Sequence, residues 1–77
     1  MYVTVKQVDV KGDTYTYRFS RGSDHGLLEL DASTKNITVL QAMDTADGTA
    51  NFFRARAAIL RELAEGVIPY ETFFASA

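Results

Sequence analysis

The residues that could carry acid–base chemistry gather in one short segment, Ser23-Asp24-His25. They are the three residue types of a hydrolase triad, in which the serine attacks, the histidine moves the proton and the aspartate orients the histidine. A triad brings these groups together from distant parts of a fold, and three adjacent residues do not reproduce that geometry. Serine and aspartate are also typical turn residues, because their side chains bond nearby backbone groups. The segment therefore predicts a turn with an exposed His25, and we expect no enzyme activity and no catalytic residues.

A cation site is the second chemical candidate, since Asp44 and Asp47 lie close to Gly48. If Gly48 took the invariant glycine position of a calcium loop, the twelfth position would fall on Arg54, which cannot supply a bidentate carboxylate. The chain has no cysteine, so a thiolate zinc site is excluded. We interpret the segment as a turn leading into a helix, and we expect neither a metal nor another cofactor.

Arg56 is the unusual residue of the predicted helix, because it lies in the middle of an apolar arc. A buried guanidinium needs a partner. One interpretation, which we favour, is that its stem packs while its charged end reaches solvent. The alternative is a buried charge paired with a carboxylate or an anion.

Composition limits the partners that this chain can bind. It has 77 residues, of which 47% are hydrophobic, and this predicts one folded domain over residues 1–77. The formal net charge of −2 disfavours a nonspecific binder of nucleic acid or anionic membrane, which needs excess lysine and arginine. No run approaches the ~20 apolar residues of a membrane span, and no signal peptide is apparent. We expect a soluble, cytoplasmic protein.

The hydrophobic period changes near residue 50 from two residues to three or four. This predicts an α+β fold: a four-stranded antiparallel β-meander over residues 1–42, one C-terminal α-helix over residues 50–65 packed on one face, and an extended aromatic tail. Thr49 or Asp47 is expected to cap the helix, and Gly66 and Pro69 to end it.

Three predicted turns set the strand register. Gly12-Asp13 places Val10 opposite Tyr15 and Val8 opposite Tyr17, and a bulge near Lys6-Gln7 would return Val5 to Phe19. The alternative is that the first residues leave this pairing or face a different partner. A turn over residues 21–26 would pair Ser20 with Leu27, Tyr17 with Leu30 and Arg18 with Glu29. A turn over residues 32–35 pairs Asp31 with Asn36, Leu30 with Ile37 and Leu28 with Val39.

In this register one sheet face is apolar, and the helix is expected to cover it. The predicted apolar arc of the helix is Phe52, Phe53, Ala57, Ile59, Leu60, Leu63 and Ala64. The residues expected to be buried together are Tyr17, Phe19, Leu30, Ile37, Phe53 and Leu60.

The second sheet face and the tail indicate self-association. Leu27 and Leu40 are expected to lie opposite each other on the face that the helix leaves open, and Tyr70, Phe73 and Phe74 also need a packing site. Two copies could bury these residues by packing the faces or by exchanging tails, whereas in a monomer the tail would fold back over its own sheet edge. We predict a homodimer, with these five residues as interface candidates.

The functional prediction is a small noncatalytic protein-interaction or homodimerisation module, to which an unidentified protein partner could also bind. The alternative is a module that binds single-stranded nucleic acid, because four strands followed by one helix resembles the element order of small dimeric modules of that kind. Nucleic acid is the less favoured partner: Tyr15, Tyr17 and Phe19, which could stack on bases, belong to the face that the helix covers.

Overall fold

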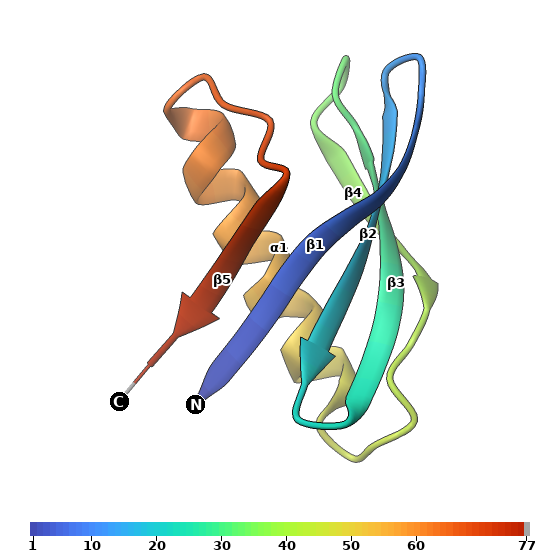
Figure 1. The fold of residues 1–77 in the computed structure, drawn as a ribbon, viewed down its shortest axis with the longest axis vertical. Coiled ribbons are helices and arrows are strands. Elements are labelled where there is room, and N and C mark those ends of the chain that lie inside the picture. The colour runs from blue at the N-terminus through green and yellow to red at the C-terminus, as the bar shows by residue number, and fades with distance from the viewer. Residues whose placement is uncertain (77) are drawn as a thin grey trace.

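The computed structural model describes residues 1–76, which form one antiparallel sheet with a single helix packed against it (Figure 1). The strands are β1 (Tyr2–Lys11), β2 (Thr14–Arg21), β3 (Asp24–Asp31), β4 (Asn36–Gln41) and β5 (Glu71–Ala75). The helix α1 (Gly48–Ala64) connects β4 to β5, and the strand order in the sheet is β4-β3-β2-β1-β5. The predicted α+β class, with an antiparallel sheet and one helix, is confirmed.

The helix is not the last element, so the predicted order of four strands and a helix is wrong in that respect. The aromatic tail forms β5, which pairs antiparallel with β1 and places Thr4 opposite Phe73 and Val3 opposite Phe74. Threonine and phenylalanine favour strands when they can pack on a half-buried surface, and the first half of β1 provides one. The tail therefore packs on its own chain as an edge strand.

The first hairpin keeps most of the predicted register. Val10 lies opposite Tyr15 and Val5 opposite Phe19, as expected, and Gly12 takes the left-handed conformation at φ +59°. The bulge, however, lies between Gln7 and Asp9, about one residue later than predicted. Val8 therefore does not face Tyr17, and its side chain is 44% exposed.

The predicted six-residue turn over residues 21–26 is wrong. Arg21 pairs with Asp24, so the turn is Gly22-Ser23, with Gly22 at φ +61°. Tyr17 consequently faces Leu28 instead of Leu30, and the register moves by two residues without changing which side chains share a face.

Gly26, assigned to the turn from sequence, is a strand residue. It lies opposite Phe19, and a Cβ there would be 2.6 Å from both the Phe19 ring and the Gln41 carbonyl oxygen. Glycine is therefore required by a close approach inside the sheet. The same shift places Arg18 opposite Leu27, so the expected Arg18–Glu29 pair does not form.

The third turn is as predicted, with Asp31 opposite Asn36 and Leu30 opposite Ile37. A second bulge lies at the other end of this pairing, where Leu27 faces Gln41. Leu27 and Leu40 are therefore not direct partners.

The core forms between the inner face of the sheet and one stripe of the helix. The core residues are Val3, Val5, Tyr17, Phe19, Leu28, Leu30, Met43, Ala55 and Ile59. The helix stripe differs from the prediction: Phe53 is 56% exposed, Leu60 is half-buried, and Asn51, assigned to the polar side, is buried. The helix is thus rotated by roughly 100°, about one residue, from the expected orientation. Ala55 and Ala58 face the sheet, since their short side chains let the two layers approach.

The helix covers only part of the inner face. It packs against β5, β1, β2 and β3. The turns that join β1 to β2 and β3 to β4 extend beyond it (Figure 1). Ile37 is half-buried, and Val39, although paired with the buried Leu28, is 45% exposed. The inner face beside β4 is therefore incompletely covered.

Candidate functional site

The segment with the residue types of a triad does not form one. Ser23 lies in the two-residue turn, while Asp24 and His25 are successive residues of β3 and so point to opposite faces of the sheet. His25 is exposed and lies opposite Ser20. Within residues 1–76, no three acidic, histidine or cysteine side chains lie close enough together to hold a metal ion.

The five interface candidates lie near opposite edges of the sheet. Leu40 belongs to the edge strand β4 and is 54% exposed, and Leu27 is half-buried on β3 beside it. Tyr70 and Phe73, which are 62% and 44% exposed, lie at the β5 edge. Phe74 is half-buried and packs on the core of its own chain. These residues therefore do not make one continuous surface.

Arg56 is exposed on α1, so its charge is not buried. The rotation of the helix explains this placement, because the stripe that faces the sheet contains Asn51, Ala55 and Ile59. The sequence could not show the rotation, since the apolar residues of this helix cover more than one face.

The β4 edge of the sheet is uncharged and open. Its sequence, Asn36-Ile37-Thr38-Val39-Leu40-Gln41, contains no charged residue and no proline. Exposed edge strands usually carry lysine, proline or inward charges, which prevent pairing with another chain. A β-bulge can also protect an edge, and β4 has one at Leu40. The rest of the strand can accept a further strand.

The β5 edge is different, because an arginine from the helix lies across it. The Arg61 guanidinium donates hydrogen bonds to the Phe73 carbonyl oxygen (3.0 Å) and to Thr72 Oγ1 (3.1 Å). It also lies 5.6 Å from the centroid of the Phe73 ring. One edge carbonyl is thereby occupied, and a second chain would have to displace this side chain.

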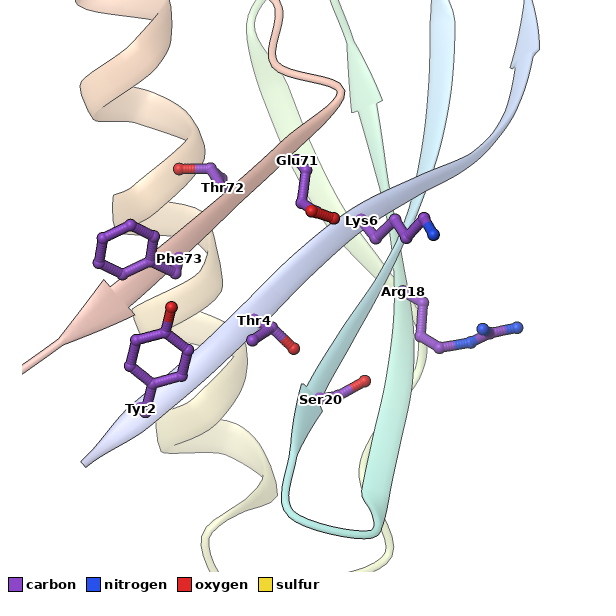
Figure 2. A pocket seen from close by; sticks show the side chains of 8 residues that line it. All are labelled: Tyr2, Thr4, Lys6, Arg18, Ser20, Glu71, Thr72 and Phe73. Atoms are coloured by element: carbon purple, nitrogen blue, oxygen red, sulfur yellow. The ribbon is translucent and has the colours of Figure 1, made fainter.

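The outer sheet face carries a groove of about 460 Å³ over β5, β1 and β2 (Figure 2). This volume is in the range of small-molecule sites, ~300–1,000 Å³. The groove, here called the outer groove, is lined by Tyr2, Thr4, Lys6, Arg18, Ser20, Glu71, Thr72 and Phe73.

The outer groove has an aromatic end and a basic end. Tyr2 and Phe73 stack with their ring centroids 5.2 Å apart and their planes at 16°. Lys6 and Arg18 lie at the other end, directly opposite each other on neighbouring strands (Figure 2). The side chains of Thr4 and Ser20, also a cross-strand pair, lie between the two ends. The sequence analysis missed this groove, because Phe73 reaches it only through the unexpected pairing of β5.

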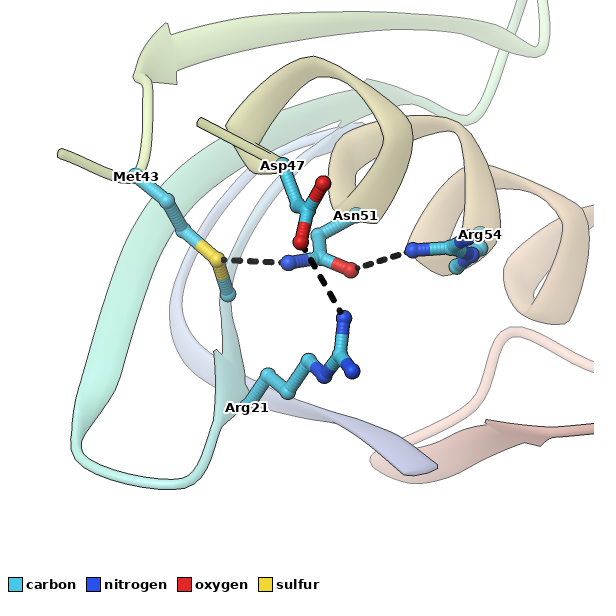
Figure 3. A network of polar contacts seen from close by, with 5 residues as sticks. All are labelled: Arg21, Met43, Asp47, Asn51 and Arg54. Atoms are coloured by element: carbon cyan, nitrogen blue, oxygen red, sulfur yellow. Dashed lines mark hydrogen bonds and ion pairs between the residues drawn. The ribbon is translucent and has the colours of Figure 1, made fainter. Parts of the chain in front are cut away.

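A polar network anchors the loop before the helix (Figure 3). Asn51 Nδ2 donates to the Met43 sulfur at 3.4 Å, and Arg54 donates to Asn51 Oδ1 at 2.8 Å. Asp47 is the N-cap residue but makes no capping hydrogen bond through its side chain, which instead lies 3.8 Å from Arg21. The buried amide of Asn51 thus has partners on both sides, and we interpret the network as structural.

Two pKa shifts report local packing. Burial raises the pKa of Tyr17 to about 12, with a smaller contribution from Tyr15, and the phenol donates a 2.6 Å hydrogen bond to the Pro69 carbonyl oxygen. Hydrogen bonds from the Ser33 hydroxyl and backbone N–H lower the pKa of Asp31. Both groups stabilise loops or turns, and neither lines the outer groove.

The chain matches no protein-family model, no curated protein and no solved structure. Within residues 1–76, no helix is long and apolar enough to cross a membrane.

Proposed function

We propose that this chain is a small noncatalytic interaction module that forms a homodimer, and that the open edge strand β4 is its contact surface. The observation that carries the proposal is the contrast between the two sheet edges. Arg61 lies across β5, whereas β4 is uncharged and uncovered. A cytoplasmic location, expected from the composition, belongs to the same proposal.

A second copy of the chain suits this edge better than a charged partner does. Two β4 strands related by a twofold axis would run antiparallel and extend the two sheets into one, without like charges in register. Lys35 precedes β4 and Asp44 follows it closely. An antiparallel alignment brings the Lys35 end of each copy toward the Asp44 end of the other, so the charges at both ends are complementary.

The exposed apolar side chains beside this edge support the same arrangement. Val39 and Leu40 are 45% and 54% exposed, and pairing at β4 would shield part of each side chain from water. Leu27 lies next to them and remains an interface candidate. Tyr70, Phe73 and Phe74 belong to the other edge, so this contact does not require an exchange of tails.

Light scattering after size exclusion, over a dilution series, tests the dimer. The chain has a mass of 8.5 kDa, so light scattering should give the dimer a mass of about twice this value. Val39→Lys and Leu40→Lys should each yield monomers, because each places two like charges near the twofold axis. Phe53→Lys is the matched control, since Phe53 is 56% exposed but lies on the helix.

A mass near 8.5 kDa for the unmodified chain at every concentration would refute self-association. A dimer that persists in both β4 variants, with unchanged circular dichroism, would refute β4 as the contact.

The second candidate function is the binding of single-stranded nucleic acid. It is favoured by the stacked Tyr2–Phe73 pair on an open sheet face beside Lys6 and Arg18. It is opposed by the net charge of −2, because phosphate contacts supply most of the affinity of such binders.

A further inference from the structure

The aromatic end of the outer groove offers a surface on which a planar ring can stack. Tyr2 and Phe73 are 54% and 44% exposed although they stack on each other. Arg61 holds Phe73 in place through the backbone hydrogen bond and the ring contact described above. An exposed and positioned aromatic pair binds a further aromatic ring at little cost in conformational entropy.

The basic end of the outer groove carries an electrostatic conflict. Lys6 and Arg18 are direct cross-strand partners, and like charges in this position destabilise a sheet. Glu71 lies opposite Lys6 on β5, but the one ion pair within 4.0 Å in residues 1–76 joins Arg21 and Asp47. An anion held between Lys6 and Arg18 would relieve the repulsion and accept charge-assisted hydrogen bonds from both.

The distance between the two ends sets the size of the ligand. Tyr2, Thr4 and Lys6 are alternate residues of β1, so the aromatic and basic ends are roughly 13 Å apart along the strand, before the reach of the side chains is counted. The short side chains of Thr4 and Ser20 leave the space between them open and provide two hydroxyl groups. An aromatic ring joined to a phosphate or carboxylate through a spacer of sugar size spans this distance, once the reach of the Lys6 and Arg18 side chains is added.

We propose that the outer groove binds a small aromatic anion of mononucleotide size, with its ring against Tyr2 and Phe73 and its anionic group between Lys6 and Arg18. The site lies over β5, β1 and β2, away from the β4 edge, so it goes beyond the proposed dimerisation and does not depend on it. One ring platform and two cations, which outnumber the single Glu71 carboxylate beside Lys6, suit one nucleotide unit, whether free or part of a strand.

An NMR titration of the full chain with adenosine monophosphate tests the site, and adenosine and inorganic phosphate serve as probes of its two halves. Adenosine monophosphate should bind at least about tenfold more tightly than either probe, since it uses both ends of the groove. The amide shifts should be confined to residues 2–6, 18–20 and 71–73. Equal affinity for inorganic phosphate, or shifts spread over the helix, would overturn the proposal.

Charge-neutral variants provide the second test. Lys6→Gln and Arg18→Gln should each weaken the binding of adenosine monophosphate about two- to fivefold, the range of an exposed ion pair, and leave the weak binding of adenosine unchanged. Both side chains are exposed, so the fold should persist. Arg56→Gln is the matched control, because it removes an exposed cation from the opposite layer. An unchanged affinity in both groove variants would overturn the proposal.

A short oligonucleotide distinguishes a free nucleotide from a strand. An affinity within about tenfold of that for adenosine monophosphate supports a site for one nucleotide unit. An oligonucleotide that binds more than tenfold more tightly, with a steep dependence on salt, would overturn the assignment to a small ligand and favour the nucleic-acid module.

Discussion

Replacing Tyr17 with phenylalanine should destabilise the fold by loosening the loop between α1 and β5. The Tyr17 hydroxyl donates a 2.6 Å hydrogen bond to the carbonyl oxygen of Pro69, which is also buried and lies 52 residues away along the chain. Phenylalanine keeps the ring packing but leaves this oxygen without its partner, which costs about 1–3 kcal/mol. For a domain of this size the melting temperature should fall by about 5–20 °C at neutral pH.

The same substitution should change the response to alkaline pH. Because the pKa of Tyr17 is raised from 10.0 to about 12, the folded state favours the neutral phenol. The stabilisation is fully present below pH 10 and is lost as the pH rises through 12, by about 2–3 kcal/mol in total. The difference in stability between the unmodified chain and Tyr17→Phe should therefore shrink over this range.

Denaturation followed by circular dichroism at pH 7 and between pH 10 and pH 12 measures both effects. Tyr70→Phe is the control, because Tyr70 is 62% exposed and its loss should matter little. Equal melting temperatures for Tyr17→Phe and the unmodified chain at pH 7, or a difference in stability that is independent of pH, would refute the reasoning.

Four further predictions concern the helix, the tail and nucleic acid. Ile59→Ala should cost about 2–5 kcal/mol in urea denaturation, whereas Phe53→Ala should cost under about 1 kcal/mol, since Ile59 is buried and Phe53 is not; equal costs would show a different helix rotation. A change from glycine to alanine stabilises most helices by about 1 kcal/mol. Gly48→Ala should instead destabilise the fold, because its Cβ would lie 2.5 Å from the Met43 carbonyl oxygen. A higher melting temperature would contradict this. Deletion of residues 71–77 should leave β1 as an unprotected edge strand, paired with β2 alone, and yield insoluble or unfolded chain, as size exclusion and circular dichroism would show. Anisotropy titrations with labelled single-stranded oligonucleotides should show no binding tighter than about 10 μM at physiological salt.

The local features of the chain determined its strands. Alternating side chains and short turns place β1 to β4, and the turn before Asn36 fixes the β3–β4 register because four residues leave few ways to close a hairpin. The turn at Gly22 shows the limit of this reasoning. A two-residue turn and a six-residue turn put the same side chains on the same face, so the pattern could not distinguish them.

The tertiary structure alone decided the helix rotation and the outer groove. Apolar residues surround much of α1, so the stripe that packs depends on how closely Ala55 and Ala58 can approach the sheet. The outer groove needs β5 beside β1, a pairing between segments about seventy residues apart that no local pattern encodes. Tyr2, Arg18 and Phe73 are ordinary strand residues in the sequence, and they share one hollow only because three strands bring them to the same face.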